Sequence, residues 1–239
     1  MRPIFYTGAV ERTEELACGV RAFYCSVPEG FAWEPGAHAH VGLPGFQEGG
    51  KPHRELVHNM SIFTLPEEGQ VAFATRLDRS GSEYKRVLAG CGAGDEFTFF
   101  REGCGLGLAR DGRPVVLLSQ GLALAAFRPL VLCAAGDMAG IPQLLSINVR
   151  DADESLFAGD LARAAAGVPA DGIKLVHVRH RGEYEAAVRA LPEPAGAAFS
   201  VVGSDDFVRG TIALLRGLDV ADDDITVDRN ASHRAPLFE

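Results

Sequence analysis

Short hydrophobic runs separated by turn residues dominate the first half of the chain. The runs are rich in Val, Phe, Tyr and Thr, and Gly, Pro and acidic residues separate them. They are ACGVRAFYCSVPEG (17–30), PGAHAHVGLPG (35–45), MSIFTLPEEGQ (60–70), VAFATRL (71–77) and DEFTFF (95–100). Such runs, bounded by turn residues, are typical of antiparallel β-structure. The pattern predicts an antiparallel β-barrel up to about residue 108.

From residue 113 the pattern changes to apolar strands that are each followed by a helical stretch rich in Ala and Leu. The strands are PVVLLS (114–119), LLSINV (144–149), KLVHVRH (174–180) and AFSVVG (198–203), and the helical stretches are LALAAFRPLVLCAAG (122–136), ESLFAGDLARAAAG (154–167), EYEAAVRAL (183–191) and DDFVRGTIALLRGL (205–218). This alternation predicts a parallel sheet with crossover helices. We therefore expect two domains, a β-barrel over residues 1–110 and an α/β domain over residues 111–239, joined within ARDGRP (109–114).

Composition and charge narrow the class of protein. With 239 residues, of which 47% are hydrophobic, the chain is long enough to bury a substantial core. Its formal net charge of -9 argues against nucleic acid and against an anionic membrane surface as partners. No apolar run reaches the roughly 18 residues of a membrane-spanning helix, and the start of the chain lacks the apolar core of a signal peptide. We expect a cytoplasmic protein without membrane insertion.

The cysteines and histidines do not predict a metal site. Five cysteines, an odd number, show no C-x-x-C or clustered spacing, which argues against a disulfide framework, an iron–sulfur cluster or a zinc site. They are Cys18, Cys25, Cys91, Cys104 and Cys133. His38 and His40 share one face of a predicted strand and could join His58 at a metal. Because no carboxylate or thiolate stands at matching spacing, hydrogen-bonded histidines are the favoured interpretation.

Two short stretches call for a chemical explanation. HNMSIFTLP (58–66) begins with a titratable residue, a thioether and a hydroxyl where packing alone would favour Val or Ile. FREGCGLGLARDG (100–112) contains G-x-G-x-G, but it follows a predicted barrel strand and does not open a helix. We therefore reject a dinucleotide-binding fingerprint in the second stretch.

Taken in order, the segments of the chain resemble the ferredoxin–NADP reductase superfamily over nearly the whole length. FAWEPGAHAHVGLPG (31–45) looks like the Pro-Gly-Gln strand of that family, and HNMSIFTLP stands in the place of its Arg-x-Tyr-Ser flavin motif. FATRLDRSGSEYKRVLAGCGAGDEF (73–97) resembles the segment that closes around the flavin diphosphate. VVLLSQGLALAAFRPL (115–130) stands at the Gly-rich turn and helix, and FSVVGSDDFVRGTIALL (199–215) at the strand that carries Cys-Gly-Pro.

The resemblance implies a flavin site on the barrel. By position, Ser61 would be the catalytic neighbour of the flavin N5 atom, Met60 would pack on the ring and His58 would contact the diphosphate. A thioether packs favourably on aromatic rings, whereas His lacks the permanent charge of Arg. Further contacts would come from Thr75, Arg76, Ser80, Gly81 and Ser82, with backbone N–H groups at the start of a helix and with Lys85 as an added positive charge. The resemblance also favours FAD over FMN.

The nicotinamide-nucleotide half departs from the family pattern. Gly121 is kept at the Gly-rich turn, while Gln120, Leu122, Ala123 and Ala126 stand at the Gly, Thr, Gly and Pro positions. Gly203 lies in Val-Gly-Ser, which replaces Cys-Gly-Pro and removes a thiol. Arg150, at a strand end, stands where the family often contacts the ribose or its phosphate, and Asp228 and Asn230 stand where an acidic residue and an aromatic residue are common.

These departures leave more than one function open. The first hypothesis is an FAD-dependent oxidoreductase that takes electrons from NADH or NADPH and passes them to an acceptor protein or a small molecule. The second is a flavin-binding electron-transfer or sensory subunit whose altered turn no longer admits the nicotinamide nucleotide. The third is a domain that binds neither cofactor and serves as an interaction surface.

Overall fold

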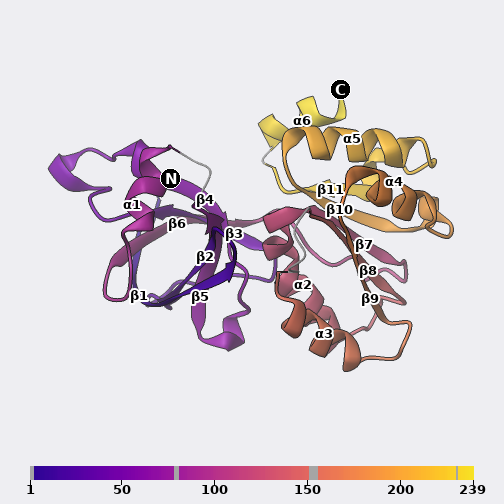
Figure 1. Ribbon diagram of the computed structural model, residues 1–239, viewed down its shortest axis with the longest axis horizontal. Helices are drawn as coiled ribbons and strands as arrows, with labels where there is room; N and C mark the ends of the chain where they lie inside the picture. Colours follow the sequence, from indigo (N-terminus) through magenta and orange to yellow (C-terminus); the bar gives the residue numbers. More distant parts are fainter. Residues whose placement is uncertain (1–2, 78–80, 151–155, 230) are drawn as a thin grey trace. The chain divides into compact units, whose positions relative to one another are not determined.

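The chain divides into two compact units, Met1–Cys104 and Gly105–Glu239. The structure, a computed structural model, describes residues 3–77, 81–150, 156–229 and 231–239. The first unit is built on an antiparallel sheet and the second on a parallel sheet with helices (Figure 1). The predicted fold class is therefore confirmed.

The first unit is a curled half-barrel of six antiparallel strands. The strand order is β4-β3-β6-β1-β2-β5. The strands are β1 (Tyr6–Ala17), β2 (Val20–Ser26), β3 (Ala37–Gly42), β4 (Val57–Ser61), β5 (Gln70–Arg76) and β6 (Glu96–Cys104). Helix α1 (Glu83–Ala89) and the short helical turns η1 (Glu48–Gly50), η2 (Arg54–Leu56) and η3 (Pro66–Glu68) lie in the connections.

The two edge strands of the half-barrel, β4 and β5, are joined at one end by the segment that follows β4. The backbone N–H of Phe63 donates to the carbonyl of Ala72 (2.9 Å), and the N–H of Ala72 donates to Thr64 Oγ1 (3.1 Å). Helix α1 packs at the same side of the sheet, because its Tyr84 is fully buried in the core and contacts the ring of His58 on β4 at a centroid distance of 4.4 Å. The edge strand β4 therefore lies against α1.

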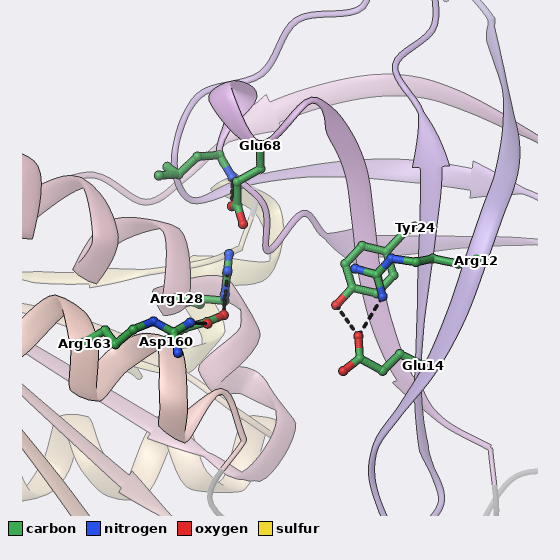
Figure 2. Close-up of polar contacts among 8 residues, drawn as sticks. Arg12, Glu14, Tyr24, Glu68, Arg128, Asp160 and Arg163 are labelled. Atoms are coloured by element: carbon green, nitrogen blue, oxygen red, sulfur yellow. Dashed lines mark hydrogen bonds and ion pairs between the residues drawn. The ribbon is translucent and has the colours of Figure 1, made fainter.

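Strand β1 is the longest strand, and the sequence pattern did not predict it. Its second half is mostly exposed and charged, so it lacks the hydrophobic alternation of a half-buried strand. A polar cluster stabilises this part of the β1–β2 pair (Figure 2): Glu14 accepts from the Tyr24 hydroxyl (3.0 Å) and from Arg12 Nη1 (2.8 Å). The Arg12 guanidinium also lies 3.3 Å from the centre of the Tyr24 ring, a cation–π contact.

The second unit is a five-stranded parallel sheet with helices on both faces. The strand order is β11-β10-β7-β8-β9. The strands are β7 (Val115–Gln120), β8 (Leu144–Val149), β9 (Ile173–Val178), β10 (Ala198–Val202) and β11 (Ile225–Val227). The helices are α2 (Leu124–Gly136), α3 (Ala158–Ala166), α4 (Arg181–Arg189), α5 (Asp205–Arg216) and α6 (Ala231–Phe238), with the turns η4 (Gly121–Ala123), η5 (Pro194–Gly196) and η6 (Asp222–Asp224). Helices α2 and α3 cover one face, and α4, α5 and α6 cover the other (Figure 1).

The four predicted strand–helix pairs of this unit are confirmed, whereas β11 and α6 were not predicted. Strand β11 has only three residues, and α6 contains Pro236, so neither gives a strong periodic pattern. The G-x-G-x-G run begins in the last two residues of β6 and continues beyond its end, and the next regular element is β7, so no helix opens there. The rejection of a dinucleotide fingerprint in that run agrees with this placement.

A charged pair joins the two helices on one face of the parallel sheet. Arg128 of α2 is buried and donates to Asp160 of α3 through Nε (3.0 Å) and Nη2 (2.7 Å), as Figure 2 shows. Arg163 of α3 also pairs with Asp160. Because a buried guanidinium is costly without a partner, this pair fixes α2 against α3.

Two properties of the described residues bear on the class of protein. No helix among them is long and apolar enough to cross a membrane. Within the same residues, no group of three or more His, Cys, Asp or Glu side chains is arranged to hold a metal ion.

Candidate functional site

Strand β4 directs His58 and Met60 toward the interior of the half-barrel. In the antiparallel pairing with β3, His58 lies opposite Val41 and Met60 lies opposite Ala39. Directly opposed residues of an antiparallel pair share a face, and Ala39 and Val41 are fully buried in the core. Met60 is half-buried and packs against this core, while His58 stays exposed at the edge.

Ser61 lies on the other face of the same strand. It is half-buried and lies opposite His38 of β3, and its neighbour in the alternation, Asn59, lies opposite His40. The four side chains therefore share the outward face. Since His58 points to the opposite face, the three histidines considered as metal ligands do not gather on one surface.

His58 is held by α1. Its ring packs on Tyr84, and this partial burial of an otherwise exposed side chain, together with the positive charge of Lys85, lowers the pKa of His58 below its usual value. The neutral imidazole is therefore favoured in the absence of an anion. Tyr84 has a buried hydroxyl without a hydrogen-bond partner among the described residues, and burial raises the pKa of this phenol. A buried hydroxyl of this kind is normally satisfied by water or a ligand atom.

The other predicted flavin contacts lie at the end of β5 and the start of α1. Thr75 is buried and Arg76 is half-buried, on the last two residues of the strand. Ser82 caps α1 by accepting the N–H of Lys85 (3.4 Å), and no atom lies within 4 Å of a Cβ built on Gly81. Ser80 lies outside the described residues. The structure thus brings His58, Lys85 and the start of α1 together at the β4 edge.

At the carboxyl end of the parallel sheet, Gly121 turns the chain from β7 toward α2. Its φ is +57°, and no atom lies within 4 Å of a Cβ built on it. The buried side chain of Asn148, on β8, donates to the Gly121 carbonyl (3.2 Å) and to Ser119 Oγ (2.8 Å). Asn148 therefore positions the turn. Sequence reasoning missed it, although a polar residue inside the apolar run LLSINV was a visible sign.

Two residues that depart from the family pattern contact each other beside this turn. The Ser204 hydroxyl donates to Gln120 Oε1 at 3.0 Å, which links the loop after β10 to the end of β7. Ser204 also caps α5, since its hydroxyl accepts the N–H of Phe207 at 3.3 Å. Turn η4 runs directly into α2, because Ala123 is helical and the N–H of Leu124 donates to the carbonyls of Gly121 and Leu122. Neither η4 nor α2 has a side-chain cap, so this helical run begins at Gly121 without a capping side chain.

Gly203 is required by packing. A Cβ at this position would lie 2.5 Å from Phe207 Cδ1 and 3.2 Å from Gln120 Cβ. The absent side chain therefore leaves room for the Phe207 ring, and the space beside Gly203 is not open to a ligand. The segment after β11 is attached to the same loop through Arg229, whose guanidinium donates to the Gly203 carbonyl (3.0 Å) and to Asp205 (3.1 Å).

Arg150 lies directly after β8 and is buried, with 8% of its surface exposed. Its backbone N–H donates to the carbonyl of Val178 on β9 (2.9 Å). Arg150 and Gly121 therefore both lie at the carboxyl end of the sheet, where α/β proteins bind ligands. Asp228 follows β11 at the same end, and Asn230 lies outside the described residues.

Comparison with known proteins supports the architecture. No protein-family model and no curated protein matches the chain. Among solved structures, the ferredoxin reductase in carbazole 1,9a-dioxygenase is 13% identical with a TM-score of 0.76, over 95% of this chain and 70% of that one. The Amycolatopsis cytochrome P450 reductase GcoB is 18% identical with a TM-score of 0.76, over 95% and 70%. A ferredoxin NADP+ reductase from Neisseria gonorrhoeae is 17% identical with a TM-score of 0.73, over 94% and 98%.

These neighbours share the fold of this chain at low sequence identity. The half-barrel followed by a parallel α/β unit is therefore the fold of the ferredoxin reductases.

Proposed function

We propose that this chain, which has the fold of the ferredoxin reductases, is an FAD-dependent oxidoreductase that takes electrons from NADH or NADPH. The acceptor would be a protein or a small molecule. The observation that carries the proposal is the β4 edge, where His58 lies against α1 and Met60 packs against the core. The fold is shared with a ferredoxin NADP+ reductase that has bound FAD and NADP. We assign flavin binding to residues 1–110 and nucleotide binding to residues 111–239.

The chemistry of the β4 edge fits FAD. The His58 imidazole, which can be protonated, lies near the Lys85 ammonium group, and this pair suits a diphosphate. Met60 offers a thioether to an aromatic ring, and the buried Tyr84 hydroxyl lacks a protein partner among the described residues. Thr75, Arg76, Ser80, Gly81 and Ser82 remain the proposed further contacts.

Ser61 is the proposed catalytic residue. Bound FAD supplies the redox chemistry, since its ring accepts a hydride from a nicotinamide and releases electrons to an acceptor. On the protein side, the Ser61 hydroxyl would donate a hydrogen bond at the ring nitrogen whose protonation changes during reduction. Its position at the end of β4, one residue beyond Met60, is compatible with this role.

The carboxyl end of the parallel sheet offers a site for the nicotinamide nucleotide. Gly121 leaves open space beside a left-handed turn, and it begins the helical run of η4 and α2, whose start has no side-chain cap and suits a diphosphate. Arg150 lies at the end of the neighbouring strand. Gly203 remains a proposed contact through its backbone only, because Phe207 fills the space beside its Cα.

A second candidate function rests on the hydrogen bond between Ser204 and Gln120. Because this bond links the ends of β7 and β10, it stands where a nucleotide would approach the Gly121 turn. In this alternative the chain binds flavin but not NAD(P)H, and it serves as an electron-transfer or sensory subunit of a larger complex.

Flavin binding and nucleotide use can be tested separately. The purified chain is titrated with FAD and with FMN, and binding is followed by quenching of flavin fluorescence. The proposal expects saturable binding of FAD at one site per chain and weaker binding by His58→Gln. Absence of binding for both flavins would refute both candidate functions. Binding without reduction by NADH or NADPH would select the second.

A further inference from the structure

A hollow lies on the outward face of the half-barrel. It has a volume of about 500 Å³ and is lined by residues of β3, β4 and β6 together with the chain start and the β3–β4 connection. Val57 and His40 border it from the face of the β3–β4 pair that also carries Asn59. His58 and Met60 point to the opposite face, and Ser61, which shares the outward face, does not line the hollow, so the hollow is distinct from the proposed flavin contacts. Its volume lies in the range of small-molecule pockets.

Three phenylalanine rings form one wall of this hollow. Phe46 and Phe100 are stacked at a centroid distance of 5.3 Å with an interplanar angle of 11°. The ring of Phe5 lies 5.1 Å from that of Phe100 and 6.1 Å from that of Phe46, and Phe5 remains 45% exposed. A large exposed apolar ring beside two buried ones is a surface that an aromatic ligand would cover.

Two cationic side chains also border the hollow, beside Pro3, Pro52 and Val57. Arg54 and Arg101 both line the hollow, and neither guanidinium has an ion pair or hydrogen bond among the described residues. No carboxylate lines the hollow within that part of the chain, although the protein carries a net charge of -9. Two arginines without acidic partners in an acidic protein indicate a site for an anion.

His40 adds a polar group at the base of the hollow. Its ring lies 5.2 Å from that of Phe100, and its Nδ1 is buried without a hydrogen-bond partner in the described chain. Burial, with the charges of Arg101 and His38, lowers the pKa of His40. The neutral ring offers a hydrogen bond without adding charge.

A β-bulge sets the direction of Arg101. The pairing of β3 with β6 shifts between His38, opposite Gly103, and His40, opposite Phe100. Arg101 lies in this extra stretch with a φ of +49°, a left-handed conformation that is uncommon for Arg. Bulges often redirect a side chain at a binding site, and here the bulge brings Arg101 to the edge of the hollow.

We propose that this hollow binds a small aromatic anion, with its ring against Phe5, Phe46 and Phe100 and its carboxylate or phosphate between Arg54 and Arg101. Different residues supply the ring contacts and the charge contacts, so a ligand needs both groups to use the whole site. The inference does not depend on the proposed function.

The test uses 1-naphthoate and 1-naphthyl phosphate as probes, titrated into the full chain by calorimetry with and without saturating FAD. At least one probe should bind at one site per chain, with an affinity that FAD leaves unchanged. The probe that binds with the higher affinity shows whether the site prefers a carboxylate or a phosphate. 1-Naphthalenemethanol, which keeps the ring but lacks the charge, should bind at least about tenfold more weakly than the better probe.

Arginine variants locate the site. Arg54→Gln and Arg101→Gln should each weaken binding of the better probe about tenfold, whereas Arg12→Gln, an arginine of the same unit outside the hollow, should leave it unchanged. Circular dichroism confirms that the variants are folded. The proposal is overturned if neither probe binds, if FAD displaces the probe, or if the Arg54 and Arg101 variants bind it as tightly as the unmodified chain does.

Discussion

Ser204 and Gln120 form a hydrogen bond of 3.0 Å between the loop after β10 and the end of β7. Both residues stand where the ferredoxin reductase pattern has a different residue, so two departures from that pattern stabilise each other. The bond lies directly beside the Gly121 turn, because Gln120 precedes Gly121 in the chain. Its effect on nucleotide use can be measured directly.

Breaking this bond is expected to favour the nicotinamide nucleotide. If the nucleotide must displace the contact in order to bind, Gln120→Ala removes that cost and lowers KM for NADH or NADPH roughly threefold to tenfold, the worth of one hydrogen bond. Steady-state kinetics with an artificial electron acceptor gives the value. Gln143→Ala, at the amino end of β8, is the matched control. A higher KM in Gln120→Ala would mean that Gln120 itself contacts the nucleotide.

Gly203→Ala is expected to destabilise the second unit by about 1 to 3 kcal/mol, because the added methyl group overpacks the Phe207 ring. Urea unfolding followed by circular dichroism measures the change. Gly107→Ala is the control, since no atom lies within 4 Å of a Cβ at Gly107 and its φ is not left-handed. Equal stability of the two variants would show that Phe207 can move without cost.

FAD affinity is expected to depend on pH through His58. The pKa of His58 is lowered from 6.5 by burial and by Lys85, and only the imidazolium pairs with a diphosphate. Affinity should therefore be highest below the pKa of His58 in the flavin-free chain, fall as the pH rises through it, and level off once His58 is neutral in the complex as well. Flavin fluorescence titrations between about pH 5 and pH 8 measure this profile.

The His58→Arg variant gives the control, because a permanent cation should bind FAD about tenfold more tightly and without the pH dependence. The same lowered pKa affects the stability of the chain without flavin. The contribution of neutral His58 to the free energy of unfolding is fully present above pH 6.5, the usual pKa of histidine. It is lost as the pH falls through the lowered pKa of the folded state. If His58→Gln shows the same dependence of FAD affinity on pH as the unmodified chain, His58 does not contact the diphosphate.

Ser61→Ala is expected to slow reduction of bound flavin about fivefold to tenfold while leaving FAD affinity nearly unchanged, because one hydrogen bond at the reacting nitrogen is lost. Anaerobic stopped-flow absorbance measures the rate. Asn59→Ala, on the same outward face of β4, is the control and should reduce at the unmodified rate. If both variants are equally slow, the effect belongs to the strand and not to the Ser61 hydroxyl.

The sequence predicted the elements whose pattern is local. The run LLSINV is strand β8 as expected, and the expected helix start after Gly81 is the start of α1, capped by Ser82. Strand β1 was missed because its charged second half is mostly exposed and therefore shows no alternation of hydrophobic and polar residues. The short strand β11 was missed because three residues carry too little pattern.

The site was predicted less completely, since it depends on register and packing between distant segments. Alternation along β4 already separates His58 from Ser61, but only the pairing of β4 with β3 shows that His58 is on the core face and Ser61 on the outward face. Gly203 was read as a ligand contact, but its clearest requirement is room for Phe207. Asn148 was overlooked because its role arises from contact with Ser119 and Gly121 on the neighbouring strand.

The central claim is that this chain moves electrons from a nicotinamide nucleotide through FAD. The most direct measurement is the visible absorption spectrum of the FAD-loaded chain under anaerobic conditions, before and after addition of NADH and then NADPH. The account predicts that the flavin bands bleach with at least one of the two nucleotides. Flavin bands that persist with both would contradict it.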